Sequence, residues 1–256
     1  MKILNKVTVT GADDSVDINE MFEIQEKYPF VEWGILLSER YSMKDGTSRF
    51  PSKEWLYKLI EKTGQEWRNN GNKPVIRLSG HICGKWTKDY LLGNYPQFNE
   101  IHSEFDWYFD RWQINTHAEY HKVDFEKAGE IIGDRLNCMP PQRVIFQLDG
   151  VNEILPHFLK RNYMNVDGLF DLSHGAGVLP SDWPKASAGD SNFVRFGYAG
   201  GLSPDNVVEQ IEKISKVSGD NIIWIDAETQ LRSPDNRIFD LDKVVQFLEK
   251  SKPYVI

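Results

Sequence analysis

The chain has 256 residues, of which 40% are hydrophobic and 27% are charged, and this balance excludes a disordered or fibrous protein. The formal net charge is −8 and no Lys/Arg-rich run occurs, so neither nucleic acid nor a membrane surface is an expected partner. Two cysteines, Cys83 and Cys138, cannot build a disulfide framework, and no long apolar segment opens the chain. We therefore predict a cytoplasmic protein.

Short β-branched or aromatic runs alternate with longer segments of helical period along the chain. The short runs predict eight strands, at Lys6–Thr10, Val31–Ser38, Val75–Ser79, Trp112–Thr116, Val144–Asp149, Gly168–Leu172, Phe193–Tyr198 and Asn221–Asp226. The longer segments predict helices at Val16–Lys27, Lys53–Arg68, Lys88–Tyr108, Asp124–Leu136, Val151–Lys160, Asp205–Lys216 and Leu241–Lys250.

The order of these elements predicts the fold. Each interval between strand starts is long enough for a right-handed crossover between parallel strands. Eight such units close into a (β/α)₈ TIM barrel of the α/β class, and we predict one domain that spans residues 1–256. A doubly wound open sheet is the competing fold, but no Gly-x-Gly-x-x-Gly follows the first strand to favour it.

Alternate residues of a barrel strand point inward, and this rule divides the predicted strands into two sets. The outward positions are apolar: Val7, Val9, Ile114, Val144, Phe146, Leu148, Phe170, Leu172, Phe196, Ile223 and Ile225. The inward positions are mostly polar: Thr8, Thr10, Ser38, Arg40, Arg77, Ser79, Gln113, Asn115, His117, Gln147, Asp149, Asp171, Ser173, Arg195, Asp226 and Glu228. Buried charges must be paired, so we expect these carboxylates to contact Arg40, Arg77, Arg195 or a ligand.

Active sites of such barrels lie at the carboxyl ends of the strands. We expect the catalytic groups among the polar residues near those ends: Thr10, Cys83, His117, Asp149 and Asp171. His81, Asp13 and Asp14 are expected on the same rim. Asp171 is the strongest of these candidates, because it ends a strand directly before a loop that contains Gly175 and Gly177.

A second glycine pair, Gly200 and Gly201, follows the seventh predicted strand. Ser203 is a natural N-cap and Pro204 suits the first helical position, so a helix is expected to begin there. Exposed amides beside a helix start can bind phosphate or carboxylate, although a tight β-to-α turn uses the same residues.

Several motifs resemble those of phosphoribosylanthranilate isomerase. The segment from Ala199 to Val207 is similar to the family's Ala-Gly-Gly-Leu-x-Pro-Glu-Asn-Val, at the same seventh strand. Weaker similarities occur at Ser38–Tyr41, at Leu169–Asp171 with its glycine loop, and at Ile225-Asp226. The resemblance covers the barrel from its second strand onward and implies a TIM barrel that binds a ribulose-phosphate-like substrate.

The resemblance also implies an activity and a set of site residues. The family performs an Amadori rearrangement by general acid–base catalysis, which makes Asp171 the general acid and Arg40 the residue that holds a substrate carboxylate. The other residues predicted to bind substrate or phosphate are Gly175, Gly177, Gly200, Gly201, Asp226 and Glu228. Two positions depart from the family. Thr10 occupies the position of the family's catalytic Cys, and Glu228 occupies the position of a Ser that helps bind phosphate.

We therefore predict an isomerase that acts on a small anionic, sugar-phosphate-like metabolite and needs no cofactor and no metal. Two alternatives stay open. His81, His117, Asp149, Asp171 and Asp226 come from different strands and could converge on a divalent metal in a hydrolase or lyase. The barrel could also bind a small molecule without catalysis. The sequence does not indicate an oligomeric state.

Overall fold

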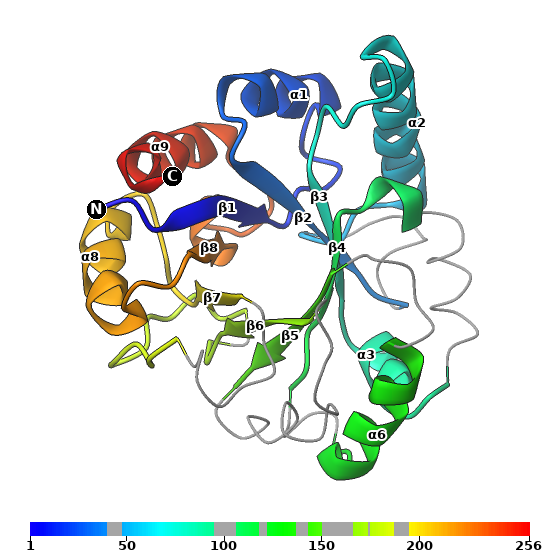
Figure 1. Cartoon of the computed structure of the whole chain (residues 1–256). Coiled ribbons are helices and arrows are strands. Elements are labelled where there is room, and N and C mark those ends of the chain that lie inside the picture. Colours follow the sequence, from blue (N-terminus) through cyan, green and yellow to red (C-terminus); the bar gives the residue numbers. More distant parts are fainter. Residues whose placement is uncertain are drawn as a thin grey trace.

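The computed structural model describes residues 1–39, 48–94, 106–117, 122–136, 143–149, 166–173, 175–186 and 195–256. Within them, eight parallel strands pair in chain order and close into a barrel, which confirms the predicted (β/α)₈ fold (Figure 1). The strands are β1 (Leu4–Thr10), β2 (Val31–Leu37), β3 (Leu78–Ile82), β4 (Arg111–Ile114), β5 (Arg143–Leu148), β6 (Val166–Phe170), β7 (Phe196–Ala199) and β8 (Ile223–Ala227).

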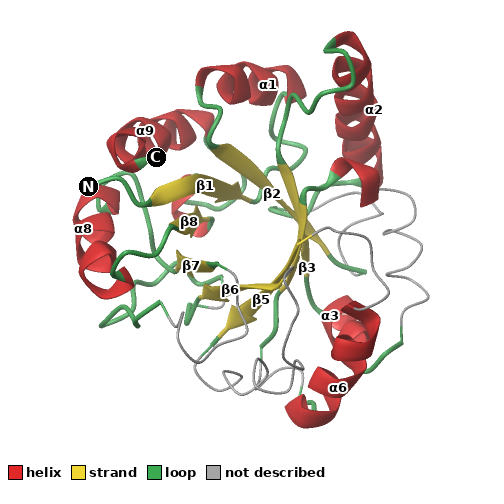
Figure 2. Ribbon diagram, in the orientation of Figure 1, coloured by secondary structure: helices red, strands yellow, loops and turns green. Residues whose placement is uncertain are grey.

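Helices surround this barrel on the outside (Figure 2). They are α1 (Ile18–Lys27), α2 (Lys53–Asn69), α3 (Lys85–Leu91), α6 (Phe125–Leu136), α8 (Val207–Ser218) and α9 (Leu241–Ser251), with short 3₁₀ turns at Asp106–Tyr108, Thr229–Leu231 and Lys252–Tyr254. Three of them begin at a residue that caps a backbone amide with its side chain: Asp17, Ser52 and Asp240. The chain ends meet, because the amide of Ile3 donates to the carbonyl of Tyr254 at 2.9 Å.

Two predicted helices differ from the structure, and one lies outside it. In place of the start of the helix predicted at Lys88–Tyr108 the structure has α3, which ends at Leu91 before Gly93 in a left-handed conformation (φ 77°), and residues 95–105 of that prediction lie outside the described residues. Helix α8 begins at Val207 rather than near Ser203, since residues 204–206 form a turn and the Asn206 side chain accepts from the Ser203 amide at 2.9 Å. The helix predicted at Val151–Lys160 lies outside the described residues.

The outward set of strand residues is confirmed with one exception. Val7, Val9, Phe146 and their counterparts are buried in a large core between the barrel and the helices. Leu172 is 44% exposed because β6 ends at Phe170, two residues before it. The alternating apolar residues therefore pack against the surrounding helices wherever they lie within a strand.

The interior at the amino end of the barrel contains a complete ion network. Glu32 accepts from Lys6 at 2.8 Å and from Arg111 Nε at 3.0 Å. Arg111 also reaches Asp167 at 3.4 Å, and its guanidinium lies 4.5 Å from the Trp224 ring centroid. All four charged side chains are at most 10% exposed. Their pairing offsets the cost of burying charge at this depth.

These partners correct the counter-charge expected at Arg77. Arg77 is exposed and precedes β3, which starts at Leu78 rather than Val75, and Arg195 precedes β7. Arg111 was missed because the fourth strand was predicted to start one residue later, at Trp112. Glycines make room for the interior side chains: a Cβ at Gly197 would overlap the Trp224 ring, and a Cβ at Gly34 would overlap Thr10 and crowd His81.

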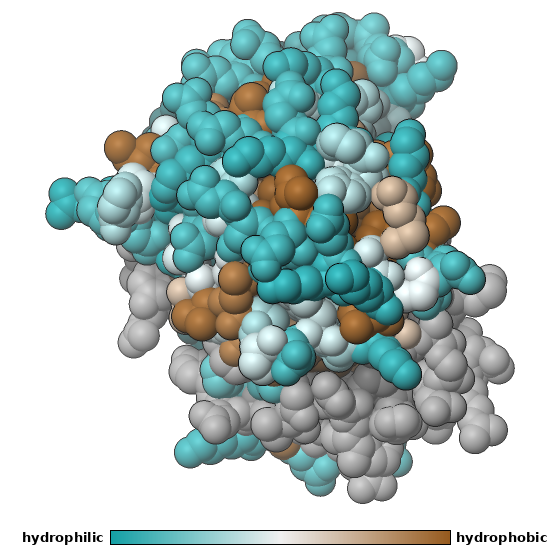
Figure 3. All heavy atoms as spheres, turned by 90° about the vertical axis from the view of Figure 1, so that its left-hand side faces the viewer, coloured by the Kyte–Doolittle hydropathy of each residue, from teal (hydrophilic) through white to brown (hydrophobic). Residues whose placement is uncertain are grey.

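The described helices include none that is long and apolar enough to cross a membrane. Seen from the side that carries α8 and α9, the surface is mainly hydrophilic, with hydrophobic side chains in small separate patches (Figure 3). Such scattered exposed residues are ordinary for a folded domain.

Candidate functional site

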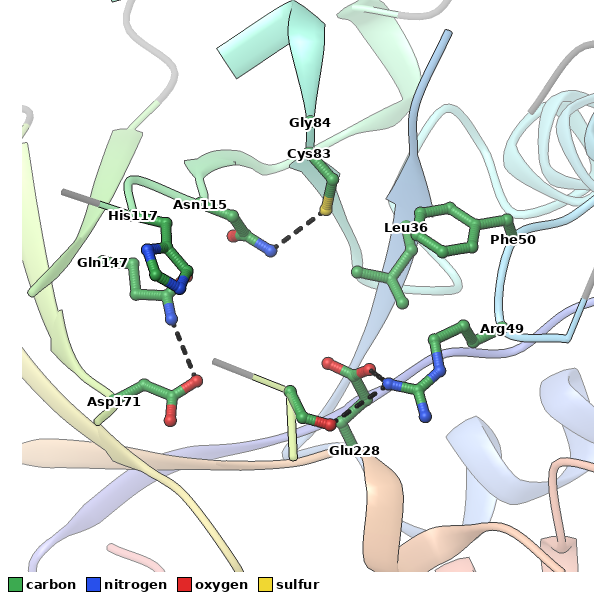
Figure 4. Close-up of a pocket in the computed structure, with 11 residues that line it drawn as sticks. Leu36, Arg49, Phe50, Cys83, Gly84, Asn115, His117, Gln147, Asp171 and Glu228 are labelled. Atoms are coloured by element: carbon green, nitrogen blue, oxygen red, sulfur yellow. Dashed lines mark hydrogen bonds and ion pairs between the residues drawn. The ribbon is translucent and has the colours of Figure 1, made fainter. Parts of the chain in front are cut away.

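A cavity of about 270 Å³ opens at the carboxyl ends of the strands. Because the strands are parallel, polar residues that follow β3, β4, β6 and β8 come together there, as Figure 4 shows. The described lining is Leu36, Arg49, Phe50, Cys83, Gly84, Asn115, His117, Gln147, Asp171, Gly175 and Glu228. Three of the five residues predicted as catalytic line it: Cys83, His117 and Asp171.

Asp171 directly follows β6 and points into the cavity (Figure 4). Its Oδ1 accepts from the Ser173 amide at 2.8 Å and from the Ser173 hydroxyl at 2.7 Å. Its Oδ2 accepts from Gln147 Nε2 at 3.0 Å, across from β5. Three donors thus fix the carboxylate in one orientation at the cavity wall.

Glu228 enters the same cavity from the end of β8 and pairs with Arg49. Arg49 Nη1 lies 2.7 Å from Glu228 Oε1, and the two side chains are 18% and 22% exposed. Burial raises the pKa of Glu228 to about 7, with Arg49 opposing this rise and the nearby Asp171 carboxylate adding to it. Glu228 therefore exchanges a proton close to neutral pH.

Arg49 is a site residue that sequence reasoning missed. It lies twelve residues beyond the end of β2, where no strand alternation marks it. Its backbone is left-handed, with φ 71°, which is uncommon for a residue other than glycine. That strain, which a sequence does not display, is the structural signal that singles it out.

Asp13 and Arg232 hold Arg49 in place. Asp13 Oδ2 accepts from the Arg49 amide at 2.6 Å and from Arg232 Nη2 at 2.7 Å. Arg232 is fully buried and also donates to the Gly11 carbonyl at 2.6 Å. Asn236 Oδ1 accepts from Arg49 Nη2 at 3.0 Å. The rim residues Asp13 and Arg232 therefore act as structural anchors for Arg49.

Asp226 and Thr10 lie beneath the cavity, inside the barrel. The Thr10 hydroxyl donates to Asp226 Oδ1 at 2.7 Å. Burial raises the pKa of Asp226 well above its usual range, and the nearby Glu228 and Asp171 carboxylates add to this rise, which the Thr10 hydrogen bond opposes. The hydroxyl predicted as a catalytic group is thus engaged with a buried carboxyl group, and its catalytic role stays a prediction.

His81 corrects the predicted rim. It is the fourth residue of β3, 1% exposed, and its ring packs over Gly34 inside the barrel. Burial lowers its pKa to about 3, so it is neutral. The later start of β3 moves this residue one layer inward from its predicted position.

Cys83 and Asp149 occupy different surroundings. The Cys83 sulfur accepts from Asn115 Nδ2 at 3.2 Å, and burial raises the pKa of the thiol, with Glu228 adding to the rise. A thiol is a weak base in that form. Asp149 is buried directly after β5, and the described cavity lining does not include it. The catalytic assignments of both residues stay predictions.

The glycines predicted to bind substrate fall into two groups. The Gly175 carbonyl accepts from Arg49 at 3.3 Å and from Thr229 at 2.7 Å, and Gly177 packs against Thr229. Gly200 and Gly201 are buried, with φ 110° and 66°, and Leu179 covers Gly201 so closely that a Cβ would overlap its backbone.

The cleft beside Gly200 and Gly201 has a volume of about 30 Å³, room for one or two water molecules. Asp171, Asp226 and Glu228 line it. Phosphate binding at this glycine pair stays a prediction, and the surrounding carboxylates oppose it. Arg40 lies outside the described residues, as does His174. The residues that the structure describes contain no group of three His, Cys, Asp or Glu side chains suited to a metal ion.

This geometry defines a TIM barrel with an acidic, arginine-bridged cavity at its carboxyl end. No family model and no curated protein matches the chain. Among solved structures it is similar to phosphoribosyl anthranilate isomerase from Thermus thermophilus, with a TM-score of 0.51, 14% identity, and coverage of 97% of this chain and 98% of that one. It is also similar to ZgEngAGH5_4 in complex with a cellotriose, with a TM-score of 0.53, 10% identity, and coverage of 100% and 96%. At such identities the likeness shows the fold.

Proposed function

We infer that the chain is an acid–base enzyme, an isomerase that acts on a small, anionic, sugar-phosphate-like metabolite at the carboxyl end of its barrel. One observation carries this proposal. Asp171 and Glu228 face the same cavity from β6 and β8, in environments that differ. A pair of carboxyl groups with different environments is the arrangement that separates an acid from a base.

The surroundings of the two groups favour Asp171 as the base and Glu228 as the acid. Asp171 accepts three hydrogen bonds and presents a carboxylate that can take a proton from substrate carbon. Glu228 has a pKa of about 7 and can deliver a proton to a ring or carbonyl oxygen near neutral pH. This arrangement reverses the role that the family resemblance implied for Asp171, because the raised pKa of Glu228 lets that group carry a proton near neutral pH.

The cavity supports a small polar substrate. Its volume of about 270 Å³ lies just below the usual range for ligand pockets. Asn115, His117 and Gln147 supply amide and imidazole groups at its wall, which suit the hydroxyl groups of a sugar. The similar structure from Thermus thermophilus is that of an isomerase, which agrees with this reaction class.

A second candidate function uses the same pair of carboxyl groups. Hydrolysis of a glycosidic bond also needs one carboxylic acid and one carboxylate, and the other similar structure holds a cellotriose. A cavity of about 270 Å³ favours isomerisation of a single sugar unit over binding of an oligosaccharide.

The test is a panel of aldose phosphates, N-glycosylamines and aryl glycosides, followed by NMR to detect both isomerisation and hydrolysis. For a turned-over substrate, Asp171→Asn is expected to lower kcat by about 100-fold or more. Glu209→Gln, which removes an exposed carboxylate on helix α8, is the matched control and should keep full activity. Unchanged kcat in Asp171→Asn would reject the assigned role.

The same panel addresses the two alternatives. A ligand that binds and is recovered chemically unaltered after long incubation would favour a binding barrel. A stoichiometric divalent ion that disappears in His117→Ala would favour metal-dependent hydrolysis or lyase chemistry.

A further inference from the structure

We propose that Arg49 is the residue that binds the anionic group of the ligand, and that Glu228 is a resident counter-ion which this anion displaces. On displacement, Glu228 takes a proton from solvent, so one anion and one proton bind together. The proposal deepens the proposed function, because it rests on the same cavity and assigns it a ligand class and a specificity-determining residue.

The position of Arg49 supports the first part. Its guanidinium projects into the cavity toward Glu228 (Figure 4). Arg49 is the single Lys or Arg among the residues described as lining that cavity. The Arg49 side chain is 18% exposed, so a ligand can reach it while bulk water is largely excluded. Such a guanidinium binds a carboxylate or a phosphate in the same forked geometry.

The backbone supports a binding role as well. Arg49 keeps a left-handed φ of 71° because Asp13 holds its amide at 2.6 Å, and Arg232 in turn fixes Asp13 at 2.7 Å. A fully buried arginine thus maintains a strained conformation whose effect is to aim Arg49 over the barrel mouth. Strain of this kind concentrates at ligand-binding positions.

The charges around Glu228 explain why an incoming anion can replace it as the partner of Arg49. Asp171 and Asp226 repel the Glu228 carboxylate, and the neutral Cys83 thiol faces it from β3. Arg232 attracts it but is already bonded to Asp13 and Gly11, which leaves Arg49 as its direct partner. When an incoming anion takes Arg49, Glu228 loses that partner among like charges, and protonation removes the repulsion.

The exchange connects binding to chemistry. A protonated Glu228, beside the anionic group that displaced it, is the general acid that the proposed reaction needs. A neutral sugar would leave the Arg49–Glu228 pair intact, and Glu228 would take up no further proton when that sugar binds. The site therefore selects an anionic ligand, because binding of the anion to Arg49 is what protonates Glu228.

The experiment uses calorimetric titration of the full chain with sulfate, which stands for a phosphate group and stays ionised, and with acetate, which stands for a carboxylate. Wild-type protein is expected to bind its preferred anion roughly tenfold more tightly at pH 6 than at pH 8. Titration in two buffers with different ionisation enthalpies should count about one proton taken up per anion at pH 8. The tighter of the two anions identifies the ligand source.

Variants separate the two residues. Arg49→Gln should weaken binding at least tenfold at pH 6, Arg49→Lys should weaken it less, and the exposed Arg237→Gln is the control that should change nothing. Glu228→Gln should bind more tightly than wild type at pH 8 and lose the pH dependence. His117 also lines the cavity, so His117→Asn is included and should keep that dependence.

Several results would overturn the proposal. They are equal affinity of Arg49→Gln and wild type, a pH dependence that survives in Glu228→Gln but vanishes in His117→Asn, or no binding of either anion by wild type. Thermal melts confirm folding, and if Arg49→Gln does not fold, the Glu228→Gln comparison decides. Asp171→Asn should still bind the anion, so a failure of the reaction proposal remains distinguishable.

Discussion

The two ends of the barrel interior use the same kinds of residues in opposite ways. At the amino end, Glu32 and Asp167 are paired with Lys6 and Arg111 in a closed network. At the carboxyl end, Arg49 is the direct partner of Glu228 in a cavity that also contains Asp171. Complete pairing makes the first region a structural layer, and an excess of carboxyl groups makes the second a chemical site.

The pKa values express the same contrast. Burial acts to raise the pKa of both glutamates, but Arg111 and Lys6 overcome it and hold the pKa of Glu32 far below its usual range. Arg49 does not overcome it, and the pKa of Glu228 rises to about 7. A buried carboxyl group is thus inert or reactive according to the number of cations that face it.

The largest expected effect is at the amino end. Arg111→Met leaves Glu32 and Asp167 buried without their shared partner, and should lower the free energy of unfolding by about 3–5 kcal/mol. Urea denaturation measures this change. Lys58→Met, which removes an exposed helical pair with Glu54, is the matched control and should have no measurable effect. Equal stabilities for these two variants would contradict the structural role of the network.

A second prediction concerns how tightly that layer is packed. Gly197→Ala should cost about 3 kcal/mol, because the added Cβ meets the Trp224 indole, which itself lies against Arg111. Gly64→Ala, in helix α2, is the control, because its backbone is not left-handed and the added Cβ would make only ordinary van der Waals contacts. Chemical denaturation of both variants tests whether interior packing or only conformational freedom matters at Gly197.

A smaller effect is expected from pH. The folded pKa of Glu228, about 7, lies above its ordinary value of 4.5, so the folded state retains a proton that the unfolded state loses. Stability from this group is present below pH 4.5 and falls as pH rises toward 7, by about 2 kcal/mol for a group of this partial exposure. Glu228→Gln removes that decline.

Comparing unfolding free energies of Glu228→Gln and wild type at pH 5 and pH 8 checks the sign. The free energy of unfolding of the variant, relative to that of wild type, should be higher at pH 8 than at pH 5. Glu32 has the opposite sign, since its lowered pKa stabilises the protein above pH 4.5 and that contribution disappears as pH falls. If Glu228→Gln were less stable than wild type at pH 8, the ion pair with Arg49 would stabilise the charged Glu228 carboxylate by more than burial destabilises it.

Hydrophobic alternation was sufficient to predict the eight strands and their outward faces, because a buried helix-facing position must be apolar wherever it lies. It was less reliable at strand starts. Val75 and Ile76 have the composition of a strand, yet the β3 ladder begins where Leu78 pairs with Trp33. That shift of three residues moved His81 inside the barrel and Arg77 outside it.

The sequence by itself determined the order of strands and helices, the inward direction of Thr10, Asp171, Asp226 and Glu228, and hence the end of the barrel where polar groups gather. Tertiary structure alone decided which charges meet. Arg49 reaches Glu228 across 179 positions of the chain, and Arg111 reaches Glu32 across 79. Local periodicity fixes the face on which a side chain lies, but charge pairing depends on register and loop path, which form only when the barrel closes.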